Sequence, residues 1–271
     1  MKADLSRETF DPKAHYTAVR LQQGRVLTDA DFNEQGELTR WRAERLAEDL
    51  IGASGGPAEG AGFALSAGTR ALAVHTASAS SVWIAGEDGA LLVSTDGGSS
   101  WTLRPLASTR HLRAIARAGN TGWAVGDGGT VLRTNNAGTD WVAQDAGSGQ
   151  TLRGVAVFDA QRAWAVGDGG LVLRTVDGGA SWTRHAAGSA RLHAVAFASA
   201  QNGLAVGPGG TILRSTDGGA GWTAVASGST ATLRAVQLAG ANAWVVGDDG
   251  TVLRSVDGGA SWTAATSGTS A

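Results

Sequence analysis

Short apolar runs alternate with polar, glycine-rich turns over most of the chain, from about residue 70 to residue 265. Each run is rich in β-branched and aromatic side chains and is too short for a helix, which is typical of strands. Four such runs occur in every unit of about 40 residues. The pattern therefore predicts one four-stranded antiparallel sheet per unit.

The same turn motif, Ser/Thr-x-Asp-Gly-Gly-x-x-Trp, lies near the end of every unit. Its acidic position recurs at spacings of 40, 41, 40 and 40 residues, which indicates five internal repeats. A short Asp or Asn side chain can accept backbone N–H bonds within its own turn, and the Trp supplies a large apolar group. We expect a structural role for these positions, which are Asp96, Trp101, Asn136, Trp141, Asp177, Trp182, Asp217, Trp222, Asp257 and Trp262.

A second motif, usually Trp-x-x-Gly, precedes each of these turns by thirteen residues, as at Trp83 and Trp123. In most units it is followed by a Gly/Asp turn and then by Val/Ile-Leu-Arg. Glycine supplies the positive φ that tight hairpins need, so we expect this turn to join the second and third strands.

The repeated turn motif resembles the Asp-box, or BNR repeat, of β-propellers, and the resemblance covers residues 70–265. A single sheet of 40 residues cannot bury both of its faces, whereas five sheets around an axis cover one another. The expected fold is all-β: a five-bladed propeller of four-stranded antiparallel blades over residues 63–271. The alternatives are a closed ring and an open arc, and we favour the closed ring; whether the segment 62–67 adds a strand across the seam is left open by the sequence.

The first 52 residues have a different pattern. Thr28 followed by acidic residues resembles a helix start, and the apolar spacing predicts one α-helix from about 29 to 51, after an extended segment. Leu38 and Trp41 lie opposite its main apolar face, so they and Phe10 are candidate partner contacts or cover the N-terminal segment itself. Residues 53–62 read as a Gly-rich linker between this docking segment, 1–52, and the propeller.

The charge distribution also divides the chain. Both lysines lie within the first 13 residues, the first 52 residues carry a net charge of −2, and the remainder is neutral. This balance gives no basic footprint for nucleic acid. The chain has no Cys and no apolar run long enough to span a membrane, and its start lacks the apolar core of a secretory signal, so we expect synthesis in the cytoplasm.

We expect no catalytic site. Asp-boxes occur in sialidases, whose chemistry needs a Tyr nucleophile, but the single Tyr, Tyr16, lies outside the propeller. Glu87 and the hairpin acids Asp127, Asp168 and Asp248 follow the repeat and are interpreted as turn formers. One carboxylate per box is too few for a calcium loop, and the histidines lack zinc spacing, so no metal or cofactor is expected.

Arginine is the remaining repeated chemistry. One interpretation is that each arginine stacks on a Trp or pairs with a turn Asp inside its repeat. The other is a guanidinium surface that binds an acidic partner. The candidates form two sets, Arg113, Arg153 and Arg234 in the first strands, and Arg133, Arg174, Arg214 and Arg254 in the third strands.

Two resemblances suggest functions. Residues 1–13, 22–26 and 29–35 resemble an N-terminal segment of baseplate-associated proteins in phage-tail-like contractile injection systems, which implies docking on baseplate or spike proteins, in several copies, within such a particle. The propeller is similar to the photosystem II assembly and stability factor family. Our leading hypothesis is a structural or adhesive component of an injection particle. The alternatives are an assembly factor that binds through arginines and a carbohydrate-binding propeller.

Overall fold

The computed structural model describes residues 70–265, apart from residues 77 and 107. The chain divides into two units, Met1–Gly62 and Phe63–Ala271, and all the described residues belong to the second. The predicted helix at 29–51, the linker at 53–62 and the segment 62–67 lie outside the described residues. Within those residues, no helix has the length and apolar character needed to cross a membrane.

The described residues have an all-β fold and form five four-stranded sheets, as the repeats predict. Every sheet takes its strands from one repeat in sequence order, and neighbouring strands are antiparallel. The first and second sheets contain β1 (Ala71–Thr76), β2 (Val82–Gly86), β3 (Leu91–Ser94), β4 (Thr102–Leu103), β5 (Leu112–Ala118), β6 (Thr121–Gly126), β7 (Val131–Thr134) and β8 (Val142–Gln144). The third sheet contains β9 (Leu152–Val157), β10 (Ala163–Gly167), β11 (Leu171–Thr175) and β12 (Thr183–Ala186).

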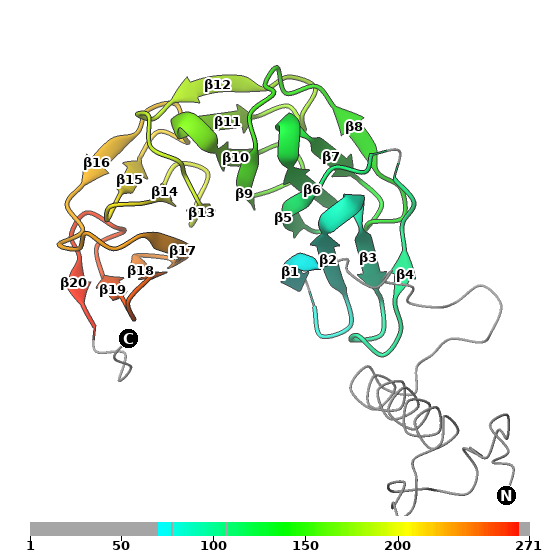
Figure 1. Cartoon of the computed structure of the whole chain (residues 1–271), viewed down its shortest axis with the longest axis horizontal. Coiled ribbons are helices and arrows are strands. Elements are labelled where there is room, and N and C mark those ends of the chain that lie inside the picture. The colour runs from blue at the N-terminus through cyan, green and yellow to red at the C-terminus, as the bar shows by residue number, and fades with distance from the viewer. Residues whose placement is uncertain (1–69, 77, 107, 266–271) are drawn as a thin grey trace, which may run out of the picture. The chain divides into compact units, whose positions relative to one another are not determined.

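The last two sheets repeat this arrangement. They contain β13 (Ala194–Phe197), β14 (Gly203–Val206), β15 (Ile212–Ser215), β16 (Thr223–Val225), β17 (Leu233–Ala239), β18 (Asn242–Gly247), β19 (Val252–Ser255) and β20 (Thr263–Ala264). Figure 1 shows that β1, β5, β9, β13 and β17 form the inner side of an arc, with the fourth strand of each sheet outermost.

Glycine makes the hairpin between the second and third strands possible. In the first three sheets this turn is a 3-10 segment, namely η2 (Glu87–Gly89), η3 (Asp127–Gly129) and η4 (Asp168–Gly170). Gly129 has a φ of 72°, and a Cβ there would lie 1.6 Å from the carbonyl oxygen of Ser148. Both the left-handed backbone and the close approach of the following loop therefore require glycine.

The hydrophobic core lies between consecutive sheets and forms four separate clusters. Its largest fully buried side chains are Trp83, Trp123 and Trp164, each on the second strand of its sheet. The box tryptophans are only partly buried. Trp141 and Trp182 pack edge-on against the second-strand Trp of the preceding sheet, with ring centroids 5.2 Å apart for Trp141 and Trp83. The second-strand Trp is therefore the main core residue of the repeat.

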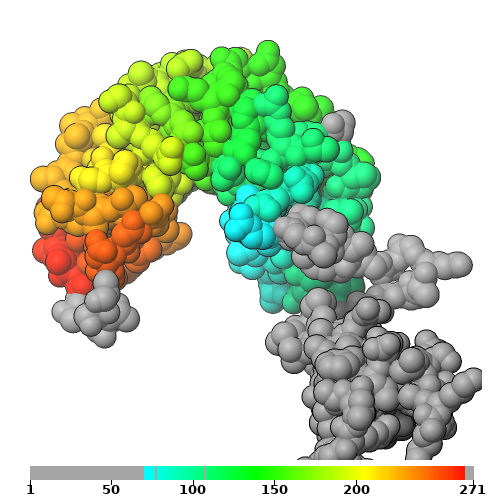
Figure 2. Space-filling view, in the orientation of Figure 1, coloured from blue at the N-terminus to red at the C-terminus, as the bar shows by residue number. Residues whose placement is uncertain are grey.

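The described unit is an open arc and differs from the closed ring that the repeats suggested. Figures 1 and 2 show the first sheet, β1–β4, and the fifth sheet, β17–β20, at opposite ends of the arc. Among the strands that the structure describes, none is shared between these two sheets. Five sheets are joined by four interfaces, and in this structure these four steps do not bring the fifth sheet round to the first.

Candidate functional site

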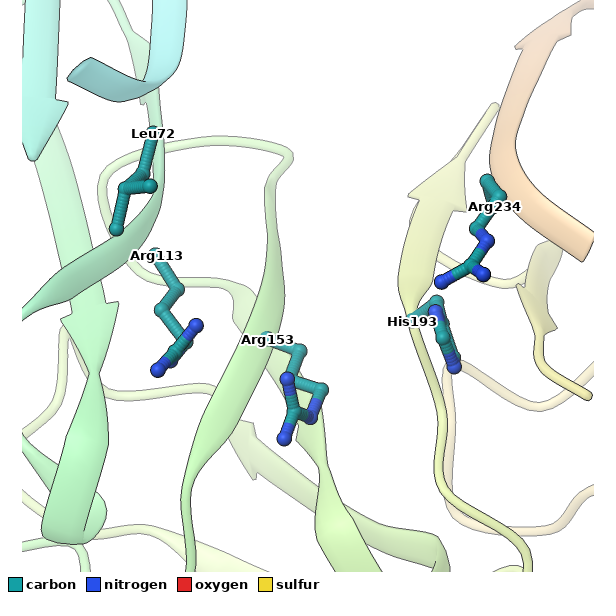
Figure 3. Close-up of a pocket in the computed structure, with 5 residues that line it drawn as sticks. All are labelled: Leu72, Arg113, Arg153, His193 and Arg234. Carbon is teal, nitrogen blue, oxygen red and sulfur yellow. The ribbon is translucent and has the colours of Figure 1, made fainter. Parts of the chain in front are cut away.

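The inner segments of all five repeats bring equivalent residues around one pocket (Figure 3). Four of them are the second residue of their inner strand, and the fifth, His193, directly precedes β13. The pocket has a volume of about 210 Å³ and is lined by Leu72, Arg113, Arg153, His193 and Arg234. We call these five residues the arginine pocket.

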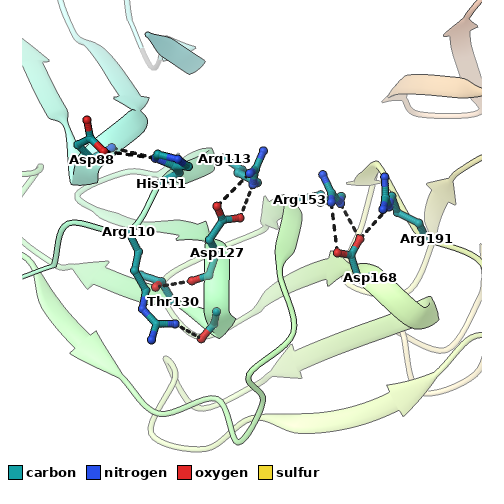
Figure 4. A network of polar contacts seen from close by, with 10 residues as sticks. Asp88, Arg110, His111, Arg113, Asp127, Thr130, Arg153, Asp168 and Arg191 are labelled. Atoms are coloured by element: carbon teal, nitrogen blue, oxygen red, sulfur yellow. Dashed lines mark hydrogen bonds and ion pairs between the residues drawn. The ribbon is translucent and has the colours of Figure 1, made fainter. Parts of the chain in front are cut away.

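The three arginines of this pocket are held by the aspartates of the hairpin turns, and Figure 4 shows the pairs of Arg113 and Arg153. The Nε of Arg153 donates to Oδ1 of Asp168 at 2.7 Å and its Nη2 donates to Oδ2 at 3.2 Å. Arg234 binds Asp248 in the same way, with both distances 2.8 Å, and Arg113 binds both carboxylate oxygens of Asp127. The expected pairing of arginine with a turn aspartate is therefore present.

These pairs keep the pocket charged. Hydrogen bonds from the arginines hold the pKa values of Asp127, Asp168 and Asp248 below the usual range of a carboxyl group. The same contacts raise the pKa values of Arg113 and Arg234. In the described part of the chain, each arginine uses its Nε–H and one N–H of Nη2 for its aspartate, so the two N–H groups of Nη1 and the second N–H of Nη2 are left for a ligand.

The repeats depart from their common pattern at two positions of the pocket. Leu72 stands where the other inner segments have a basic residue, and His193 replaces arginine in the fourth repeat, where Pro208 replaces the turn aspartate. Burial, and then the charges of Arg234, Arg153 and Arg191, lower the pKa of His193. His193 is therefore neutral at pH 7, and the pocket is most basic at Arg113, Arg153 and Arg234.

The second arginine set lies elsewhere and connects neighbouring sheets. Arg174 donates from Nε to the carbonyl oxygen of Gly218 at 2.8 Å, and Arg214 donates to that of Gly258 at 2.9 Å. Arg133 lies over the ring of Trp123, with its guanidinium carbon 5.5 Å from the centroid. The structure therefore separates the two sets: the third-strand arginines contribute to the interfaces between sheets, with Arg254 exposed on the fifth.

The Asp-boxes have the hydrogen bonds expected of a structural turn. Oδ1 of Asp177 accepts the N–H of Ser181 at 3.0 Å and the hydroxyl of Thr175 at 2.8 Å. The Ser181 hydroxyl also donates to Asp177, and this bond, followed by the two just named, lowers the pKa of Asp177 to about 2. Asp96, Asp217 and Asp257 form the same turn, as does Asn136, whose amide oxygen accepts the N–H of Asp140.

A buried hydroxyl begins each box, and its role was not predicted from the sequence. The Thr175 hydroxyl donates to Asp177 and accepts the N–H of Gly179 at 2.7 Å, so it connects both halves of the turn. The recurrence of Ser or Thr at this position was the available signal. Arg191 was also not predicted as a site residue, and its Nε lies 2.9 Å from Oδ1 of Asp168.

The described residues contain no group of three or more His, Cys, Asp or Glu side chains suited to a metal ion. Glu87 pairs with Arg70, whose Nη2 donates to Oε1 at 2.8 Å. The candidates Phe10, Leu38 and Trp41 lie outside the described residues.

This architecture and site define a class, a β-propeller unit of Asp-box repeats with a basic pocket at its inner strands. A sequence profile described as "Photosynthesis system II assembly factor YCF48" matches residues 62–148, 112–192 and 187–268, and the chain belongs to this family. Residues 1–91 match a second profile, described as a family of unknown function, DUF6519. No curated protein sequence matches the chain.

Solved structures have the same fold. A structure described as "YCF48 bound to D1 peptide" is 24% identical, with a TM-score of 0.58 over 72% of this chain and 66% of that chain. The WD40 repeats of RRP9 are 14% identical, with a TM-score of 0.60 over 70% of this chain and 64% of that one. An ancestral GH74 enzyme is 19% identical, with a TM-score of 0.54 over 68% of this chain and 30% of that chain. At these identities the likeness establishes the fold alone.

Proposed function

We propose that this protein is a non-enzymatic, peptide-binding assembly factor that takes an acidic segment of a partner protein in the arginine pocket. The observation that carries the proposal is the convergence of Arg113, Arg153 and Arg234, from three different sheets, on one pocket. Each presents Nη1 while its aspartate fixes the direction of the guanidinium group. Pre-oriented guanidinium groups suit carboxylates, because a planar fork of donors matches the two carboxylate oxygens.

Membership of an assembly-factor family supports a protein partner, and one structure of the same fold is described as bound to a peptide. The carboxyl groups argue against acid–base catalysis. Every carboxyl pKa that departs from its ordinary value in the described part of the chain is lowered, by arginines in the hairpin turns and by serine, threonine and backbone donors in the boxes. A general acid working at neutral pH needs a raised carboxyl pKa.

The test uses the full chain and a fluorescent peptide of alternating alanine and glutamate with a free C-terminal carboxylate. We expect the triple substitution R113Q, R153Q and R234Q to weaken its binding by about tenfold or more, because three charge-assisted contacts are lost. Arg184→Gln is the matched control, since Arg184 is exposed and contacts Gln150 instead. Equal affinity of the triple variant, with an unchanged circular dichroism spectrum, would refute the proposal.

A second candidate function concerns residues 1–52. Docking of this segment on a contractile injection particle, with the propeller presented for adhesion, stays a prediction. The match of residues 1–91 to a family of unknown function favours a conserved module there but names no partner. Deleting residues 1–52 should abolish co-purification with sheath and baseplate proteins, and incorporation of the shortened chain would contradict this role. The same experiment tests the prediction that the protein, after synthesis in the cytoplasm, is assembled into such a particle.

A further inference from the structure

The fourth repeat departs from its neighbours at two positions that are partners in the other repeats. In the second, third and fifth repeats, an inner-strand arginine binds the aspartate of the hairpin turn, which follows it by 14 or 15 residues. In the fourth repeat, His193 replaces the arginine and Pro208 replaces the aspartate. His193 therefore lies in the arginine pocket without a carboxylate from its own turn.

The turn that contains Pro208 keeps the hydrogen bonds of the aspartate turns. Thr211 donates from its N–H and from its hydroxyl to the carbonyl oxygen of Pro208, at 3.2 Å and 2.6 Å. In the second repeat, Thr130 donates in the same way to the carbonyl oxygen of Asp127, at 3.2 Å and 2.8 Å. The fourth repeat has therefore lost the carboxylate of this turn but has kept its backbone.

Positive charge is in excess around this position. Three guanidinium groups and one carboxylate act on the imidazole of His193, namely Arg234, Arg153, Arg191 and Asp248. Arg153 and Arg191 share the single carboxylate of Asp168, with Nε–Oδ1 distances of 2.7 Å and 2.9 Å. Asp248 is bound to Arg234. Within the described unit, these three arginines thus pair with two carboxylates, and one positive charge beside the imidazole is not compensated.

The imidazole of His193 is neutral in the free protein and is placed to gain a proton. Burial, followed by the charges of Arg234, Arg153 and Arg191, lowers its pKa. Figure 3 shows the ring beside the guanidinium group of Arg234. Its Nε2 is as many bonds from Cα as the Nε with which an arginine reaches its aspartate. A carboxylate at the position of the missing turn aspartate therefore reaches His193, and an opposite charge at such a distance favours the protonated ring.

We propose that the acidic partner segment places one carboxylate where the turn aspartate of the fourth repeat is missing, and that His193 takes up a proton as this carboxylate binds. The inference rests on the proposed function, because it concerns the ligand of the same arginine pocket. The proton comes from the solvent, and the imidazolium then pairs with the ligand carboxylate. The guanidinium groups stay charged throughout, so His193 alone makes the affinity depend on pH between pH 6 and pH 8.

The first test measures the affinity of the full chain for the alanine–glutamate peptide, labelled at its N-terminus, at pH 8 and at pH 6. The peptide carboxylates stay ionised over this range, because their pKa values are about 4. We expect the affinity of the unchanged protein to rise about threefold or more as the pH falls, and His193→Gln to abolish this rise. His111→Gln is the matched control and should keep the rise, since Nδ1 of His111 accepts the N–H of Asp88 at 3.0 Å, outside the pocket.

The second test, Pro208→Asp, supplies the missing carboxylate from the chain itself and needs no peptide for its main readout. In the free protein, the added aspartate should raise the pKa of His193, which a pH titration of the histidine NMR signals measures. The same substitution should weaken peptide binding about fivefold, because the added negative charge repels the acidic ligand. It should also reduce the pH dependence of binding, since His193 then holds its proton before the peptide arrives.

The outcomes separate this inference from the proposed function. Equal affinity at pH 8 and pH 6, or a pH dependence that survives in His193→Gln, would overturn the inference and leave the binding of acidic peptides intact. An unchanged His193 titration in Pro208→Asp, with an unchanged circular dichroism spectrum, would also overturn it, because the turn would then not face the imidazole. Failure of the unchanged protein to bind the peptide at either pH would refute the proposed function and this inference with it.

Discussion

Arg153 and Asp168 form a two-point ion pair in which the hairpin turn of the third sheet holds an arginine of its inner strand, with N–O distances of 2.7 Å and 3.2 Å. Asp168 also lies 2.9 Å from Nε of Arg191, so one carboxylate orients two arginines. The aspartate both directs the arginine and offsets its charge. The pocket is therefore pre-oriented but only weakly positive.

This pair predicts that Asp168→Asn tightens the binding of an acidic peptide. Removing one negative charge beside the pocket should raise the affinity about fivefold, the factor that corresponds to about 1 kcal/mol for a partly screened charge. Fluorescence anisotropy at low salt measures the change. Asp159→Asn is the control, because Asp159 pairs with Arg162 in the same sheet, outside the pocket. Weaker or unchanged binding by Asp168→Asn would show that the orientation of the guanidinium groups, rather than the negative charge of Asp168, limits the affinity.

The Asp-boxes predict a loss of stability in acid. Serine and threonine hydroxyls and backbone N–H groups lower the pKa values of Asp96 and Asp177 from 3.8 to about 2. A carboxyl pKa lowered by folding contributes stability above its unfolded value, and this contribution disappears as the pH falls through the folded value. The melting temperature should therefore decrease as the pH is lowered from about 4 to about 2. A midpoint that is constant over this range would contradict the stabilising role of the boxes.

Asn136 provides a matched substitution for the same turn. Its amide oxygen accepts the N–H of Asp140 and the hydroxyl of Thr134, both at 2.9 Å, as an aspartate would. We expect Asp177→Asn to fold with a small change in melting temperature and with less loss of stability in acid, while Asp177→Ala removes the acceptor and lowers the melting temperature further. Equal melting temperatures for the two variants would show that the side-chain acceptor is dispensable.

The second-strand tryptophans should dominate the stability of the sheets. Trp164 is fully buried, stacks on Phe197 at a centroid distance of 3.5 Å and donates to the carbonyl oxygen of Gly218 at 2.7 Å. Trp164→Ala should cost about 3–5 kcal/mol in urea unfolding, as for other large core truncations. Trp164→Leu should cost less, because Leu204 occupies this position in the next repeat. Trp244→Ala, at an exposed counterpart, is the control and should cost least.

Some hairpin glycines are required because a Cβ would clash with a neighbouring loop, and this steric effect can be measured separately from the effect of a positive φ. Gly170 and Gly147 have similar φ values, 68° and 65°. A Cβ on Gly170 would lie 2.2 Å from the carbonyl oxygen of Gly188, whereas one on Gly147 would meet nothing within 4 Å. Gly170→Ala should therefore lower the melting temperature much more than Gly147→Ala, which carries only the cost of the left-handed backbone. Similar losses for both variants would remove the steric argument.

The repeats made most of the fold predictable. A 40-residue period with four strand-like runs specified the sheets and their order, because strands joined by tight turns pair with their neighbours. The period also placed Arg113, Arg153 and Arg234 at equivalent positions, and thus at one site. It did not specify the curvature of the arc, which depends on how Trp83 and its counterparts pack on the next box. The exposure of Trp244 could not be predicted from the sequence either, because its repeat motif is the same as that of the tryptophans that a neighbouring sheet covers.

The division of the core into clusters between neighbouring sheets has a consequence for unfolding. An inner sheet such as β9–β12 is held by two interfaces, whereas each end sheet of the described unit is held by one. Stability in such arrays is a sum of nearest-neighbour contributions, so cooperativity extends only as far as the interfaces do. Heating should therefore fray the arc from its ends inward, and the calorimetric enthalpy should exceed the van't Hoff enthalpy.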